Sequence, residues 1–150
     1  MKNKITLFLA FLSTIVIVIP ACEKENNTPA AKTKTELITQ SSWKFEKATA
    51  LGTNISTHPS LACYIDNTIK FETNLSGTGT EGASACSTPI PSTFTWSFQN
   101  SESILRLSFI LFSGGSPDFT IVSLTETNLV VSQTITVGST PTPVEVTFKH

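Results

Sequence analysis

The chain has 150 residues, with ten basic and eleven acidic side chains and a formal net charge of −1. Because it has one arginine and no basic cluster, it lacks the positive surface that nucleic-acid binding requires. The length suits one domain with a single core.

The N-terminus reads as an export signal that is cleaved before Cys22. Lys2 and Lys4 flank the start of an apolar run that is long enough for a signal-peptide core and short for a membrane span. The run ends in IPAC, residues 19–22, which resembles the lipobox of bacterial lipoproteins, where the thiol takes a diacylglycerol. We therefore expect residues 1–21 to be a lipoprotein signal peptide and Cys22 to be the lipidation site. The alternative is an ordinary secretory peptide with an incidental cysteine.

A polar tether follows Cys22. Residues 22–35 carry no large apolar side chain and contain proline and alanine among mixed charges, a composition that stays disordered. Loss of the signal leaves eight basic against eleven acidic residues, a net charge of −3. We expect an outer-membrane lipoprotein of a Gram-negative bacterium that faces the periplasm or the cell surface, with one folded domain over residues 36–150.

The two remaining cysteines, Cys63 and Cys86, are an even pair in a chain bound for an oxidising compartment. We expect a disulfide between them, worth about 3 kcal/mol in the chain-entropy account. A metal site built from His58, Asp66 and the same two cysteines is the alternative, but the spacing typical of zinc ligands is missing.

The rest of the chain has the two-residue periodicity of β-strands. A helical turn in TELITQSS, residues 35–42, precedes the first strand. Apolar and polar side chains then alternate, and clusters of turn-forming residues separate the segments. We predict about eight strands, within residues 42–48, 68–73, 76–82, 94–99, 104–112, 118–126, 128–137 and 144–149.

The short connections favour a meander of antiparallel neighbours, which closes as an eight-stranded up-and-down barrel without exposed edges. An immunoglobulin-like sandwich would place a tryptophan between its cysteines, whereas Trp43 and Trp96 lie outside the interval from Cys63 to Cys86. A membrane-spanning barrel is disfavoured because the outward positions carry charged and hydroxyl side chains. The predicted fold class is therefore all-β, with a short N-terminal helical turn.

The order of motifs resembles the lipocalin-like domains of bacterial lipoproteins over most of residues 36–150. The motifs are the lipobox, a leucine-bearing turn into the Trp43 strand, CYIDNTIKF, GTGTEG before Cys86, FTWSF, IVSLTETNLVVS and VEVTFKH. The counterparts of the recurring family positions are Cys63, Asp66, Phe71, Cys86 and Trp96. The resemblance implies a lipocalin-like barrel and names no ligand.

Groups able to catalyse a reaction at neutral pH are few. His58 precedes a proline in a polar loop, and Asp66 and Glu72 flank a strand, where carboxylates usually accept hydrogen bonds from backbone N–H groups. The abundant serines alternate with apolar residues, as on a solvated strand face, and no triad suggests itself. We expect neither an enzyme nor a cofactor.

The apolar alternation suggests a cup for a small apolar ligand, bound non-covalently as in lipocalins. The predicted cavity residues are Trp43, Phe45, Ile69, Phe71, Trp96, Phe98, Leu107, Phe109, Val131 and Val146. The wider interior adds Phe94, Leu105, Leu129, Val144 and Phe148.

Two alternatives stay open. In the first, these side chains simply fill a small barrel. In the second, a solidly packed barrel presents loops, around His58 and at residues 113–117, that bind a surface glycan or a protein. The expected partners are thus the membrane, through Cys22, and a small apolar ligand, while a protein partner stays undefined.

Overall fold

The computed structural model of the chain describes residues 30–59, 61–137 and 140–150. The expected signal peptide, Cys22 and the first part of the expected tether lie outside these described residues. Residues 31–150 form one compact unit. Among the described residues, no helix has both the length and the apolar character needed to cross a membrane.

The first element is the short helix α1, Lys34–Thr39, and its start has a local cause. The Thr33 hydroxyl accepts a hydrogen bond from the Glu36 N–H, and the Glu36 carboxylate accepts one from the Thr33 N–H. This capping box satisfies two N–H groups that the first helical turn leaves free. The bonds from Thr33 hold the pKa of Glu36 below its usual value. The expected helical turn is confirmed, and it begins at Lys34, inside the stretch assigned to the tether.

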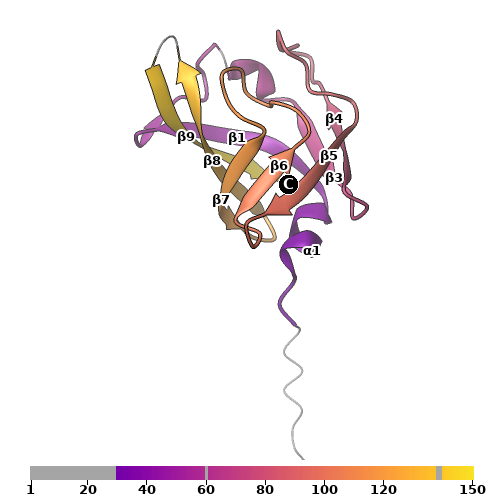
Figure 1. The fold of residues 1–150 in the computed structure, drawn as a ribbon. Coiled ribbons are helices and arrows are strands. Elements are labelled where there is room, and N and C mark those ends of the chain that lie inside the picture. The colour runs from indigo at the N-terminus through magenta and orange to yellow at the C-terminus, as the bar shows by residue number, and fades with distance from the viewer. Residues whose placement is uncertain (1–29, 60, 138–139) are drawn as a thin grey trace, which may run out of the picture. The chain divides into compact units, whose positions relative to one another are not determined.

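In the described part of the chain, the other elements are nine strands and one 3₁₀ turn. The strands are β1 Ser42–Ala50, β2 Thr53–Asn54, β3 Thr68–Phe71, β4 Ser76–Thr80, β5 Phe94–Gln99, β6 Ile104–Leu107, β7 Asp118–Leu124, β8 Asn128–Val137 and β9 Thr140–Lys149, and the turn is η1 Ala62–Tyr64. From β3 to β9 each strand pairs antiparallel with the next, and β1 pairs with both β3 and β9. The sheet therefore closes as the predicted eight-stranded antiparallel barrel (Figure 1), to which β2 is a short addition.

Strand β1 changes partner along its length. Its first residues pair with β3, from Ser42↔Lys70 to Lys44↔Thr68, and its last residues pair with β2. On its other edge the register with β9 shifts between Phe45 and Lys47, which leaves Glu46 as a bulge. A bulge adds local twist, and this one lies where β1 leaves β3.

Strand β6 is shorter than the apolar run 104–112 predicted, because the chain leaves the sheet after Leu107. Leu111 and Phe112 are consecutive and both buried, at 4% and 2% exposure. Neighbouring side chains of a strand point to opposite faces, so two consecutive buried residues do not fit a strand with one solvated face. The segment 108–117 instead crosses the end of the barrel and turns both side chains into the core.

Strand β9 starts earlier than predicted and takes in Pro141 and Pro143, which the sequence had placed in a turn. The two prolines alternate, so both lack an N–H on the same side of the strand. Register pairing of β9 with β1 begins at Val144↔Ala50, immediately after the second proline. The prolines thus occupy the part of β9 that has no neighbour on that side, where proline is tolerated and blocks edge-to-edge pairing.

The connections differ between the two ends of the barrel (Figure 1). At one end, here called the α1 end, the turns 72–75, 100–103 and 125–127 are short and α1 lies below them. At the other end, called the loop end, three long connections meet, namely residues 51–67 with η1, residues 81–93 and residues 108–117.

Candidate ligand-binding site

The barrel interior contains a cavity of about 20 Å³. All its lining side chains are apolar, and nine of the ten come from the strands. The exception is Leu111, which belongs to the loop after β6. The lining residues are Trp43, Ile69, Phe71, Leu105, Leu107, Leu111, Phe119, Leu129, Val131 and Phe148.

The volume of this cavity limits what it can hold. About 20 Å³ is close to the space that one water molecule needs, and pockets for small organic ligands usually measure about 300–1,000 Å³. An apolar cavity of this size offers a water molecule no hydrogen bonds. The interior as it stands is therefore a nearly filled core, and a larger molecule enters only if part of the wall moves.

At the α1 end the interior is closed by Trp43 and Ile38, both fully buried. The Trp43 indole N–H donates to the Ile38 carbonyl at 2.8 Å, which satisfies the polar atom of the indole and a carbonyl near the end of α1. The His150 ring lies 3.9 Å from the Trp43 ring, centroid to centroid, and its Nδ1 lies 3.1 Å from the Ser42 carbonyl oxygen. Residues from both ends of the folded unit thus close this end.

At the loop end the closing residues are Leu111 and Phe112, held from one side by Tyr64. The Tyr64 hydroxyl donates to the Leu111 carbonyl at 2.7 Å, and its ring packs edge-on against Phe112 with the centroids 5.1 Å apart. Burial raises the pKa of the Tyr64 phenol above its usual value, and the negative charge of Glu81 adds to the rise. The phenol therefore stays neutral and able to donate over the physiological pH range.

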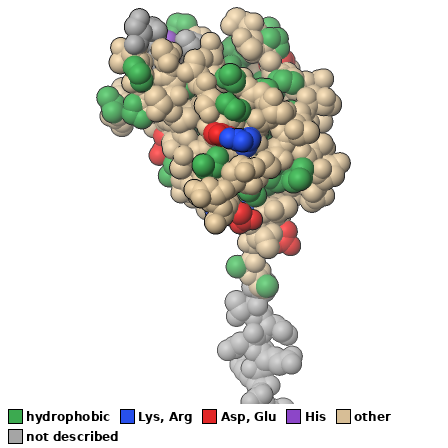
Figure 2. Space-filling view, viewed as in Figure 1, with side chains coloured by type: hydrophobic (Ala, Val, Ile, Leu, Met, Phe, Trp, Pro, Cys, Tyr) green, Lys and Arg blue, Asp and Glu red, His purple; other side chains and the backbone are tan. Residues whose placement is uncertain are grey.

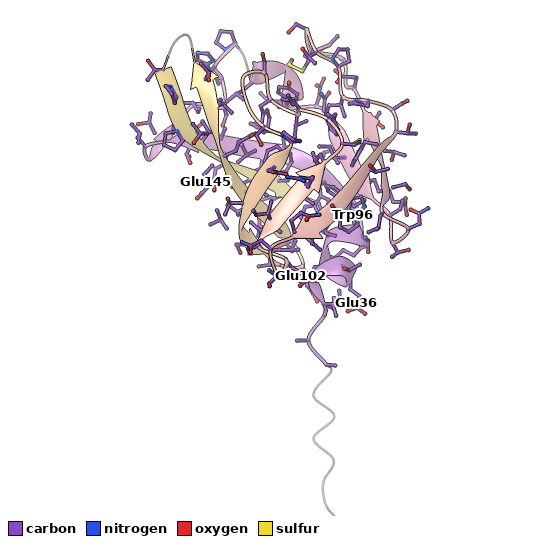
Figure 3. The ribbon with its side chains drawn as sticks, viewed as in Figure 1. Glu36, Trp96, Glu102 and Glu145 are labelled. Carbon is purple, nitrogen blue, oxygen red and sulfur yellow. A yellow bond between two sulfur atoms is a disulfide. The ribbon has the colours of Figure 1, made fainter. Side chains whose placement is uncertain are left out.

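The predicted disulfide is confirmed: Cys63 and Cys86 are bonded, and they join the loop that carries Tyr64 to the loop after β4. The sulfur–sulfur bond is visible at the loop end in Figure 3. Glu81 orders the second loop, since its carboxylate accepts hydrogen bonds from the Ile90 N–H at 2.6 Å and from the Asn67 amide at 3.2 Å. Two of the three long connections are therefore tied covalently and by hydrogen bonds.

The third connection, residues 108–117, is fastened to β8. Ser116 N–H donates to Gln133 Oε1, and Thr136 N–H donates to the Gly114 carbonyl, each at 2.9 Å. Gly114 has φ +77°, and a Cβ there would lie 2.9 Å from a backbone oxygen of Thr136, so the turn requires a glycine. Gln133 Nε2 is buried and finds no hydrogen-bond partner among the described residues.

The predicted cavity residues divide into two groups. Trp43, Ile69, Phe71, Leu107 and Val131 line the cavity. Phe45, Trp96 and Val146 are buried but do not line it, and Phe98 and Phe109 are only half-buried. The alternation of the sequence identified which side chains of each strand point inward. It could not show which of these inward side chains line the cavity.

Trp96 is bonded to the β3–β4 turn at the α1 end and does not line the residual cavity. Its indole N–H is shared between the carbonyls of Glu72, at 3.2 Å, and Ser76, at 2.9 Å, in the β3–β4 turn. Its ring packs edge-on against Phe71 with the centroids 5.5 Å apart. Figure 3 labels Trp96 beside the barrel wall, with Glu36 and Glu102 below it at the α1 end. Of the two tryptophans, Trp43 is therefore the one placed to report on the cavity.

Leu111 and Phe119 are interior residues that the sequence prediction missed. Phe119 follows the same alternation as its neighbours on β7 and is 2% exposed, so a stricter count of that strand would have found it. Leu111 had no such signal, because it reaches the cavity from a loop.

The carboxylates considered for catalysis are engaged elsewhere. Asp66 accepts a hydrogen bond from the Ser84 N–H at 3.0 Å, and Glu72 pairs with Lys70 at 2.8 Å. The Arg106 guanidinium binds both oxygens of Asp118 across β6 and β7 and lowers the pKa of that carboxyl. Residues 30–59, 61–137 and 140–150 hold no group of three or more potential metal ligands, and the disulfide removes both thiols from the alternative metal site.

Comparison with known protein families matches residues 39–131 to the model of the lipocalin-like domain. The matched segment covers more than half of the chain and runs from α1 into β8. No curated protein matches the chain.

Proposed function

The chain belongs to the lipocalin-like domain family, and on that premise we propose that it binds a small apolar or amphipathic molecule non-covalently at the loop end of its barrel. The observation that carries the proposal is the composition of the cavity wall. Every lining side chain is apolar, and Leu111, which helps to close the loop end, is the lining residue that comes from a loop. An apolar interior of this kind favours transfer of apolar surface out of water.

Binding requires movement of residues 109–112, the part of the segment 108–117 that precedes the bond from Ser116 to Gln133. The strands are hydrogen-bonded around the whole barrel, so they cannot spread without breaking the sheet. Outward movement of Leu111 and Phe112 would instead enlarge the cavity toward the loop end and leave the ladders intact. The domain acts by holding its ligand and performs no covalent chemistry, in keeping with carboxylates that are engaged in structural contacts.

A ligand screen tests this proposal. The purified protein is titrated with fatty acids, sterols, haem-like molecules and oligosaccharides, and intrinsic fluorescence and thermal unfolding are followed. A ligand at a hundredfold excess over its dissociation constant should stabilise the fold by about 2.7 kcal/mol. Saturable changes in fluorescence or unfolding temperature with apolar compounds would support ligand binding inside the barrel.

Leu111→Ala sharpens the screen, because it removes the loop side chain from the cavity wall. We expect this variant to bind apolar compounds more tightly than the wild type does. Ile110→Ala is the matched control, since Ile110 is the neighbouring residue and is 49% exposed. If neither the wild type nor Leu111→Ala responds to any apolar compound, ligand binding inside the barrel is excluded.

The second candidate is an interaction module whose barrel stays packed, and the small cavity volume favours it. Leu51, Ile65 and Ile110 are exposed at the loop end, with Leu51 at 86% and at a φ of +49°. An exposed leucine in the left-handed region is unfavourable for two reasons. Its apolar side chain is in water, and its backbone conformation brings Cβ close to the following carbonyl oxygen. In this alternative the loops contact a glycan or a protein, and the screen would yield responses only to oligosaccharides or to a protein partner.

We further propose that the domain is held at the outer membrane of a Gram-negative bacterium by acyl chains on Cys22. The apolar run ending at Ala21 and the polar stretch after Cys22 support this proposal. Cys22→Ala should leave the protein unprocessed or released from the membrane. Normal processing with tight membrane attachment in that variant would contradict it.

A further inference from the structure

Gln133 is a polar side chain in an interior row of the barrel. On β8 the residues Leu129, Val131 and Ile135 are buried and share one face, and Gln133 occupies the position between the last two. Its register partner on β9 is Val144, which is 2% exposed. Gln133 therefore faces the same side as the cavity-lining Val131 and lies two residues nearer the loop end, a step of about 7 Å along a strand.

The orientation of the Gln133 amide is set by the loop above it. Ser116 N–H is a donor, so the amide oxygen must face it, and that bond is 2.9 Å long. Exchange of the amide oxygen and nitrogen would bring two donors together. The buried Nε2 group is thus a donor, and it has no acceptor among the described residues. A buried unpaired donor is unfavourable, and such groups are uncommon enough in folded proteins to need a reason.

The charges around Gln133 restrict the acceptor it could take. Lysine and arginine are absent from residues 51–59, 61–67, 81–93 and 108–117 at the loop end, from β8, and from residues 140–148 of β9. The last residue of β9, Lys149, lies at the α1 end and pairs with Glu46. On the face drawn in Figure 2, basic side chains appear only where one touches an acidic group. A carboxylate buried beside Gln133 would find no lysine or arginine in these segments to offset its desolvation. A neutral oxygen has no such cost.

We propose that Gln133 Nε2 donates a hydrogen bond to a neutral carbonyl, ether or hydroxyl oxygen in the polar end of an amphipathic ligand. The apolar part of that ligand enters the barrel past Val131, and Gln133 Oε1 keeps its bond to Ser116. This inference rests on the proposed ligand-binding function and names the chemical class of the ligand: a neutral amphiphile with an oxygen acceptor at one end.

The test compares three probes with equal numbers of carbon atoms: 2-tridecanone, tridecane and tridecanoate. Their affinities are measured on the purified protein by tryptophan fluorescence and thermal unfolding. We expect the ketone to bind about tenfold more tightly than the alkane, as one net hydrogen bond to a neutral acceptor allows, and more tightly than the carboxylate.

Two variants assign this preference to Gln133. Gln133→Leu and Gln133→Met both remove the amide donor, and methionine keeps an unbranched side chain of similar length. Both should reduce the ratio of ketone to alkane affinity to about one. Ser132→Ala, at the neighbouring position on the opposite face of β8, should keep the wild-type ratio. Thermal unfolding identifies a variant that fails to fold, in which case the other variant decides.

The outcomes separate this inference from the proposed function. An unchanged ratio in the Gln133 variants would show that Gln133 only fastens the loop and would overturn the inference, as would tightest binding of tridecanoate. Ligand binding inside the barrel would stand in both cases. Failure of all three probes to bind the wild type and Leu111→Ala would instead overturn the proposed function itself.

Discussion

The two ends of the barrel are closed in different ways. At the α1 end, turns of a few residues join the strands, and Trp43 is bonded to Ile38, five residues before it. At the loop end, long connections cross the barrel, and their contacts join residues far apart in the chain. Tyr64 bonds to Leu111 across 47 positions, and Cys63 is bonded to Cys86 across 23.

This difference suggests that the α1 end serves the stability of the barrel and that the loop end can move. A closure made by short turns and by Trp43, which contacts Ile38 and His150, forms with the sheet and has little freedom to open. A closure made by loops can open while the strands stay paired, and binding residues commonly lie on loops that a rigid scaffold positions. In the proposed function the ligand therefore acts at the loop end, while the α1 end holds the scaffold together.

The largest effect is expected from Trp43→Ala at the α1 end. The side chain is fully buried and lines the cavity, so its removal should lower the free energy of unfolding by about 3–5 kcal/mol. Urea unfolding followed by circular dichroism measures the change. Lys44→Ala, at the exposed neighbouring position, should change it by less than about 0.5 kcal/mol. A similar loss in both variants would show that the α1 end is not a specific closure.

A smaller effect is expected when the loop-end disulfide is removed. Replacing Cys63 and Cys86 together by serine should cost about 3 kcal/mol, the loop-closure entropy for the enclosed segment. Hydrogen exchange should speed up in residues 61–67 and 81–93 while the α1 end keeps its protection. Uniform acceleration over the whole sheet would contradict the separation of the two ends.

Tyr64→Phe should cost about 2 kcal/mol, because it removes the donor to Leu111 and leaves that carbonyl unpaired. The pH dependence of the free energy of unfolding gives a second test of the role of Tyr64. Since the folded pKa of Tyr64 is raised, its stabilising contribution is complete below the unfolded value near 10 and is lost as the pH rises through the folded value. Wild-type stability should therefore fall above about pH 10 more steeply than that of Tyr64→Phe. Parallel curves for the two proteins would assign the alkaline loss to other groups.

The smallest effect is expected at the start of α1. Thr33→Ala removes the cap on Glu36 N–H and should cost about 1 kcal/mol, and Thr33→Ser should retain most of it because serine caps as well. Thermal unfolding of the three proteins measures this difference. No difference between alanine and serine would mean that α1 is held only by the burial of Ile38.

The repeating features of this protein could be read from its sequence. Alternation placed Trp43, Phe71 and Val131 on inward faces, turn-forming clusters separated the strands, and short connections implied antiparallel neighbours that close as a barrel. The pairing of Cys63 with Cys86 followed from their being the only two cysteines left after Cys22. Each of these inferences depends on neighbouring residues in the chain or on the even number of remaining cysteines. Both can be read without knowing the tertiary structure.

The tertiary structure decided what the interior can hold. Leu111 reaches the cavity from a loop with no periodic signal, and the bond from Ser116 to Gln133, which fastens that loop to β8, joins residues that are 17 positions apart. A volume of about 20 Å³ results from the packing of ten side chains from several strands and a loop. Packing depends on the simultaneous positions of residues that are distant in the chain, and a pattern along the chain carries no such information.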